Sequence, residues 1–90
     1  MVEFEWDEDK RRSNLEKHGF DFNVARILLD GRSQVSIPSP RDEEMRFATT
    51  AEVGGLLYTG IWTQRNESIR VISLRRGRRA EEREYRAVHG

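Results

Sequence analysis

Residues Ser68 to Tyr85, SIRVISLRRGRRAEEREY, join a strand pattern, an arginine cluster and a helix pattern in one stretch. The first part alternates at a period of two and is rich in β-branched residues, which predicts a β-strand. The second part turns helical near Ala80. One face of the strand is expected to hold Ile69, Val71 and Ser73, and the other Arg70, Ile72 and Leu74.

Four arginines surround Gly77 directly after this strand, namely Arg75, Arg76, Arg78 and Arg79. An unpaired charge is costly in a low-dielectric interior, so these side chains are expected on an exposed rim of the sheet. The guanidinium fork matches phosphate oxygens, so such a rim suits a polyphosphate ligand. The alternative is a solvated loop whose arginines pair with acidic residues elsewhere in the chain.

The 90-residue chain has the size of one domain, spanning residues 1–90, with a thin core, since 36% of its residues are hydrophobic and 36% are charged. A second protein covering part of its surface is therefore expected. It has no cysteine, so disulfides and thiolate metal sites are excluded. Neither a signal-peptide pattern nor a membrane-spanning run is present, which predicts a cytoplasmic protein.

The formal net charge is zero, but the charges are unevenly distributed along the sequence. Acidic residues are concentrated in the first nine positions, and arginines are concentrated between Arg70 and Arg79. A polarised field steers a polyanion to one face even when the charges sum to zero. Nucleic-acid binding is therefore compatible with the composition.

The first helix is predicted between a capping residue, Asp7, and a terminating glycine, Gly19. Val2 to Trp6 alternates as a strand, and Asp7 is expected to cap a polar helix that runs to about His18. Gly19 then ends this helix in the left-handed conformation. Asp21 is predicted to cap a second, short amphipathic helix that ends at Asp30-Gly31 and has the inward residues Phe22, Ala25, Leu28 and Leu29.

The middle of the chain predicts a run of antiparallel strands. They cover Gln34–Ile37, which is closed by Pro38 and a loop at 39–42, then Met45–Val53 and Leu56–Thr63, with a hairpin at Gly54-Gly55 and a looser turn at 64–67. A last helix is expected from about Arg78 to Val88. This order predicts an α+β domain whose sheet is covered mainly on one face.

With these residues in place, the chain resembles the BrnT family of bacterial type II toxins. The resemblance is carried by Phe4-Glu5-Trp6-Asp7, Lys10, Asn14, Lys17-His18-Gly19, Phe22, Ala25, Glu44, Arg46, Arg70-Val71-Ile72-Ser73, Arg75, Arg76, Arg79, Glu81 and Tyr85. It implies a RelE-like fold with an antiparallel sheet, two N-terminal helices and one C-terminal helix. It also implies an endoribonuclease that arrests translation and is neutralised by an antitoxin. Gly77 and Leu74 depart from the family pattern, which has alanine at both positions, and Gly77 is expected to loosen the joint between strand and helix.

Metal-independent RNA cleavage needs a base, an acid and cations for the charge that develops at phosphorus after attack by the 2′-OH. Arg75 and Arg79 are the candidates for charge stabilisation and are expected to be exposed. Glu81 is a candidate base or a group that orients an arginine, and His18 either titrates in catalysis or caps its helix. The candidate RNA-binding residues are Arg46, Arg70, Arg76 and Tyr85. The alternatives are that the arginines form ion pairs with Glu44 and Glu81, and that Tyr85 packs on the sheet.

Other polar and aromatic residues fit structural roles. Asp7, Glu8 and Asp9 suit helix capping, and His18 and His89 are too isolated for a zinc site, so neither a metal nor a cofactor is predicted. Trp6 and Trp62 are expected in the core or facing a partner, and Asn14 and Lys17 are expected to be structural.

The second functional hypothesis is an inactive nucleic-acid- or protein-binding module of the same fold. The expected partners are RNA and an antitoxin, in a homodimer or a toxin–antitoxin hetero-oligomer.

Overall fold

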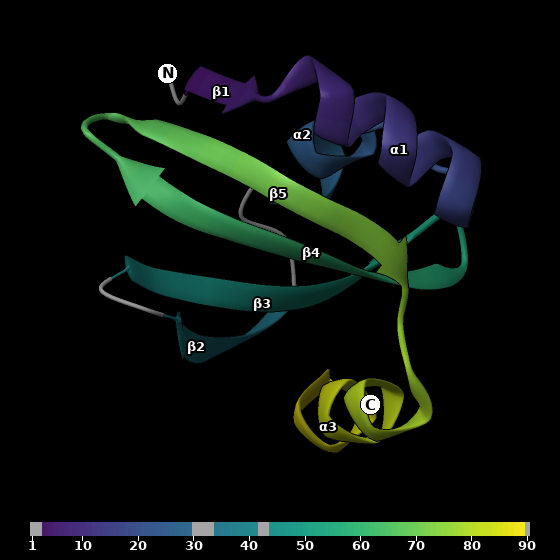
Figure 1. The fold of residues 1–90 in the computed structure, drawn as a ribbon. Helices are drawn as coiled ribbons and strands as arrows, with labels where there is room; N and C mark the ends of the chain where they lie inside the picture. Colours follow the sequence, from purple (N-terminus) through teal and green to yellow (C-terminus); the bar gives the residue numbers. More distant parts are fainter. Residues whose placement is uncertain (1–2, 30–33, 42–43, 90) are drawn as a thin grey trace.

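A computed structural model describes residues 3–29, 34–41 and 44–89, which form one five-stranded sheet and three helices (Figure 1). The sheet has the strand order β1-β5-β4-β3-β2. Among the described helices, none is long and apolar enough to cross a membrane. The elements in chain order are β1 (Glu3–Trp6), α1 (Glu8–His18), α2 (Val24–Leu28), β2 (Gln34–Arg41), β3 (Glu44–Val53), β4 (Leu56–Arg65), β5 (Ser68–Arg76) and α3 (Arg79–His89).

The sheet is mixed. Strands β2 to β5 form the predicted antiparallel run, but β1 pairs parallel to β5, with Glu3 opposite Ser68 and Trp6 opposite Val71. The α+β class is confirmed, whereas the prediction of an antiparallel sheet is wrong. A parallel pair needs a long crossover connection, and the chain between β1 and β5 supplies one.

Helices lie on both faces of the sheet (Figure 1). On one face, α2 packs against the sheet and forms the core with Phe22, Ala25, Leu28, Ala51, Val71 and Leu74. On the other face, α3 lies over β2 and β3. The expectation of a sheet covered mainly on one face is therefore wrong. The sequence predicted a helix from about Arg78 to Val88, but it contained no signal for the face of the sheet that this helix covers.

The ends of α1 are as predicted. The Asp7 carboxylate accepts hydrogen bonds from the backbone N–H groups of Asp9 (2.9 Å) and Lys10 (3.2 Å), and Gly19 has φ 78°. Asp21 does not cap the second helix directly. Its carboxylate accepts from the N–H of Asn23 (2.9 Å), and α2 begins one residue later, at Val24. The predicted end at Asp30-Gly31 lies outside the described residues.

Strand β2 is longer than predicted, because Pro38, Ser39, Pro40 and Arg41 continue it to the end of its pairing with β3. Proline lacks an N–H and is tolerated in edge strands, and β2 is an edge strand. The hairpin glycines Gly54 and Gly55 have φ 60° and 85°, as a primed turn requires. Asp42, part of the predicted loop, lies outside the described residues.

Strand β5 contains an irregularity that the alternation rule missed. Opposite β4, Ile61 pairs with Ser73 and Trp62 pairs with Val71, so Ile72 is an extra residue on β5. This bulge shifts the alternation by one position. Val71 and Leu74, predicted on opposite faces, are 1% and 0% exposed in the same core.

Candidate nucleic-acid interface

Three of the strand arginines that the sequence singles out, Arg46, Arg70 and Arg75, share the sheet face that α3 also occupies. In the cross-strand register, Arg46 on β3 and Arg70 on β5 both lie beside Thr63 of β4. Further along the same face, Arg75 lies opposite Thr59, whose hydroxyl contacts the helix residue Glu81. The bulge is part of this arrangement, because it sets the face on which the end of β5 presents its side chains.

Arg75 forms a two-bond ion pair with Glu81. Its Nη1 and Nη2 donate to Oε1 (2.7 Å) and Oε2 (2.8 Å) of the carboxylate. The two side chains are only 15% and 19% exposed, so the prediction that Arg75 is exposed is wrong. The reason is that α3 begins directly after the joint and brings Glu81 back over the end of β5.

Glu81 is held by more than this pair. Oε1 also accepts from the hydroxyl of Thr59 (3.0 Å) and from the backbone N–H of Arg78 (2.7 Å), which is the N-terminal hydrogen bond of a capping box. Burial raises the pKa of the carboxyl, but the bonds from Arg75 and Arg78, the charge of Arg75 and the bond from Thr59 outweigh it and lower the pKa to about 2. Glu81 is therefore ionised at neutral pH and is a poor proton acceptor.

The Arg75 guanidinium keeps one edge available. A guanidinium has five N–H donors. Nη1 uses both of its N–H groups, on Glu81 and on the carbonyl of Arg76 (3.2 Å), and Nη2 uses one on Glu81. The Nε–H and the second Nη2–H therefore donate to no acceptor in the described part of the chain. These two donors lie side by side and match two phosphate oxygens.

Three exposed arginines follow Arg75, and we call Arg76, Arg78 and Arg79 the basic joint. None of the three forms an ion pair with another described residue. The joint is anchored to the sheet, because the N–H of Gly77 donates to the carbonyl of Leu57 (2.8 Å). The sequence analysis gave Arg75 and Arg79 the same role and the same exposure. In the structure their environments differ, because Arg75 is bonded to Glu81 whereas Arg79 is exposed.

The remaining strand arginines have acidic partners. Arg46 contacts Glu44 (3.3 Å), and Arg70 donates to Glu5 of the neighbouring β1 (2.7 Å). Arg46 thus shows the pairing with Glu44 that the sequence left open, whereas the partner of Arg70, Glu5, was not predicted; both arginine side chains are 25% exposed. They lie on the same face as Arg75, so they border the surface that an RNA strand would cross.

The aromatic side chains have packing roles. Tyr85 is 7% exposed on α3, with its ring centroid 4.9 Å from that of His89, so little of the ring is free for stacking on a base. Trp6 contacts Phe22 edge-on at 6.0 Å. Trp62 stacks on Phe47 at 4.7 Å and donates its Nε1–H to the hydroxyl of Thr49 (2.8 Å).

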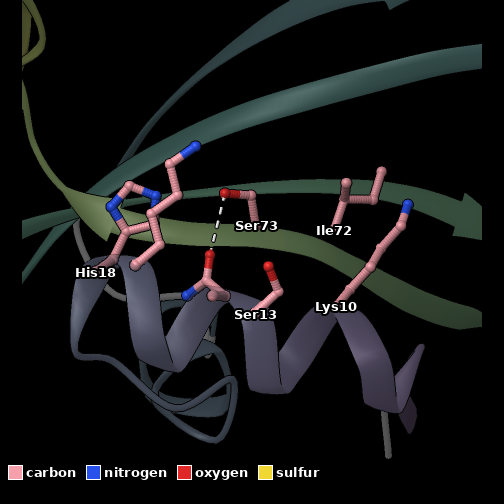
Figure 2. A pocket seen from close by; sticks show the side chains of 7 residues that line it. Lys10, Ser13, His18, Ile72 and Ser73 are labelled. Atoms are coloured by element: carbon pink, nitrogen blue, oxygen red, sulfur yellow. Dashed lines mark hydrogen bonds between the residues drawn. The ribbon is translucent and has the colours of Figure 1, made fainter.

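His18 lies at the end of α1 in the wall of a cavity of about 260 Å³. In Figure 2 its side chain and those of Lys10 and Ser13 extend from α1 beside β5. No described contact joins His18 to Arg75 or Glu81. The cavity nevertheless reaches Ser73, two positions before Arg75 on β5, a separation of about 7 Å along a strand.

Two features of the candidate site were missed by the sequence reasoning. The first is the contact of Thr59 with Glu81, for which the sequence carries no signal, because it depends on where α3 packs. The second is the cavity lined by Lys10, Asn14 and Lys17. Their spacing of four and three residues places them on one side of α1 and could have identified this group. Within the described ranges, no group of three or more His, Cys, Asp or Glu side chains could hold a metal ion.

The comparisons agree with the resemblance. Residues 6–81 match the family described as the ribonuclease toxin, BrnT, of type II toxin–antitoxin systems. No curated protein matches the chain. The matched range includes α1, the whole sheet apart from most of β1, the basic joint and Glu81. Such systems pair a toxin that acts on RNA with an antitoxin. The chain therefore belongs to the BrnT family of ribonuclease toxins.

Proposed function

We propose that this toxin cleaves RNA without a metal ion, by attack of the substrate's own 2′-OH on the adjacent phosphate, and that the cleavage arrests translation in the cytoplasm. The observation that carries the proposal is the Arg75 guanidinium, fixed by Glu81 with one edge available for phosphate. A preorganised donor pair stabilises the charge that develops at phosphorus without reorganising during the reaction. The exposed basic joint beside it supplies charge for neighbouring phosphates.

The other site residues are assigned complementary roles. Glu81, ionised and bonded to Arg75, is a positioning residue. Arg79 contributes charge from the first turn of α3, and Arg46 and Arg70 border the path of the strand. His18 is proposed as the proton-transfer group, because its cavity reaches the same face of β5 as Arg75. The whole chain would act as one RelE-like domain, with an antitoxin neutralising it by covering this surface.

The direct test is cleavage of single-stranded RNA by the purified chain in the presence of EDTA. We expect products ending in a 2′,3′-cyclic phosphate, and we expect a 2′-deoxy substitution at the scissile nucleotide to block the reaction. Expression of the chain should arrest growth, and co-expression of a neighbouring antitoxin gene should restore it. Loss of activity in EDTA, or unchanged cleavage of the 2′-deoxy substrate, would contradict the proposed mechanism.

The role of Arg75 is tested by Arg75→Lys, which keeps the charge beside Glu81 but removes the side-by-side donors. We expect kcat to fall by about 100-fold, the order observed when a single transition-state donor is removed. Arg83→Lys, an exposed change on α3, is the matched control and should retain parental kcat. An Arg75→Lys protein as active as that control would show that the guanidinium does not contact the reacting phosphate.

A further inference from the structure

The cavity between α1 and the edge of β5 is lined almost entirely by polar side chains. Its lining consists of Lys10, Ser13, Asn14, Lys17, His18, Ile72 and Ser73. Lys10 and Lys17 are the only lysines in the sequence, beside fourteen arginines, and both line this cavity. The chain thus places both of its flexible ammonium groups at one site.

Among the residues that the structure describes, no acidic side chain lines the cavity. The acids of α1 are Glu8, Asp9 and Glu16, and Glu8 is bonded to Arg11 (2.7 Å). In the described ranges, neither lysine forms an ion pair. The two ammonium groups therefore add positive charge that no neighbouring side chain neutralises.

Asn14 belongs to the floor of the cavity and is not available to a ligand. Its Nδ2 donates to the carbonyls of Phe20 (3.2 Å) and Leu74 (2.8 Å). Its Oδ1 accepts from the N–H of Leu74 (3.0 Å) and the hydroxyl of Ser73 (3.3 Å). Both amide hydrogens are used, so the groups left to meet a ligand are Lys10, Lys17, Ser13 and His18.

We propose that this cavity is a subsite for an RNA phosphate next to the one that reacts at Arg75. The inference rests on the proposed function, and it adds Lys10 and Lys17 to the RNA-binding residues. Lysine binds phosphate as a mobile point charge, whereas arginine binds it through a fixed fork, so the two sites suit an anchoring and a reacting phosphate respectively. The strand path from the cavity to Arg75 is short, since Ser73 and Arg75 share a face of β5 about 7 Å apart.

A polynucleotide fits these features better than an acidic protein segment does. The cavity holds two separate ammonium groups, has one apolar residue in its lining, and continues to a guanidinium with two free donors. Consecutive phosphates of one strand can occupy both positions. The buried centre of a protein interface, in contrast, is depleted in lysine and enriched in aromatic residues, whereas this lining holds two lysines and only Ile72 as an apolar residue.

Binding is tested with a short 2′-O-methyl RNA, which cannot react and so separates binding from cleavage. We expect Lys17→Gln and Lys10→Gln each to weaken binding about tenfold. The slope of log affinity against log salt should fall by about 0.7 for each lysine removed, as for one phosphate contact on a single strand. Arg12→Gln is the matched control, because Arg12 is an exposed cation of α1 that does not line the cavity.

A second measurement locates the contact. Reductive methylation with isotope-labelled formaldehyde gives one NMR signal for each lysine and one for the terminal amine. Both lysine signals should shift saturably with the oligonucleotide, and the kcat of cleavage should be retained while KM rises in the lysine variants. Lysine variants that bind like Arg12→Gln, or lysine signals that move only with an antitoxin, would overturn the subsite. A chain that binds through the lysines but never cleaves RNA would instead contradict the proposed function alone.

Discussion

Glu81 connects three parts of the molecule through one carboxylate. It accepts from a strand hydroxyl (Thr59), from the last part of β5 (Arg75) and from the backbone that starts α3 (Arg78). The same residue thus fixes the guanidinium and the first turn of the helix. A carboxylate with these partners supports both stability and the geometry of the site, and its protonation should affect both.

The pH dependence of stability follows from the lowered pKa of Glu81. The ordinary value is 4.5 and the folded value is about 2, so the stabilisation is present above pH 4.5 and is lost as pH falls toward 2. Glu81→Gln should lower the free energy of unfolding at pH 7 by about 3 kcal/mol. It should also flatten the dependence between those two pH values. Urea denaturation across this range measures both effects.

Glu82→Gln is the matched control, because Glu82 is exposed and contacts only Arg86, at 3.6 Å, among the described residues. Its effect at pH 7 should be below about 0.5 kcal/mol. Equal effects of the two substitutions would show that the network around Glu81 adds no specific stability.

At the scale of the elements, β5 depends on α1 as well as on its neighbouring strands. Strand β1 pairs with β5 only from Ser68 to Val71. Beyond that point, the amide of Asn14 takes the place of a strand, donating to the carbonyl of Leu74 and accepting from its N–H. The first helix therefore completes the hydrogen bonding of β5 next to Arg75.

Asn14→Ala should lower the free energy of unfolding by about 2–4 kcal/mol, because two backbone groups of the buried Leu74 lose their partner. Asn23→Ala is the control, since Asn23 is exposed and makes no side-chain cap bond. Thermal and urea denaturation compare the two. An Asn14→Ala protein with parental stability and no RNA cleavage would assign Asn14 to catalysis instead.

The elements were largely predictable from local signals, and their pairing was not. Caps and turns such as Asp7, Gly19 and Gly54-Gly55 depend on nearby residues, so the sequence contains the needed information. The bulge at Ile72 depends on how β4 and β5 align, and the parallel pairing of β1 depends on contacts distant in sequence. The arginine cluster was recognisable, but the partner of each arginine required the positions of α3 and β1.

In the whole molecule, charges are distributed differently in space than along the sequence. The acidic N-terminal strand lies beside the start of β5, where Glu5 neutralises Arg70. The basic joint, Lys10 and Lys17 form no ion pair with another described residue, so they contribute positive charge near Arg75. A field of this kind steers an RNA strand and an acidic antitoxin segment to the same surface.

The rate of association with an antitoxin should therefore depend on salt. Between about 0.1 and 1 M salt the Debye length falls from about 10 Å to 3 Å, and we expect the association rate to fall by about tenfold or more. The dissociation rate should change less, because apolar contacts determine much of the lifetime. Stopped-flow mixing measures both rates. An association rate indifferent to salt would mean that the antitoxin binds elsewhere and does not neutralise the toxin by covering the basic joint.

The contact of Asn14 with Leu74 also has a consequence for self-association. An open strand edge is a template on which another chain can add a strand and begin to aggregate. One border of this sheet is β1, an edge strand of only four residues, and past its end the Asn14 amide bonds to β5. The other border, β2, contains Pro38 and Pro40, whose nitrogens carry no hydrogen to donate. The sheet is thus a poor template at either border, and a toxin freed from its antitoxin should remain dispersed and available to its substrate.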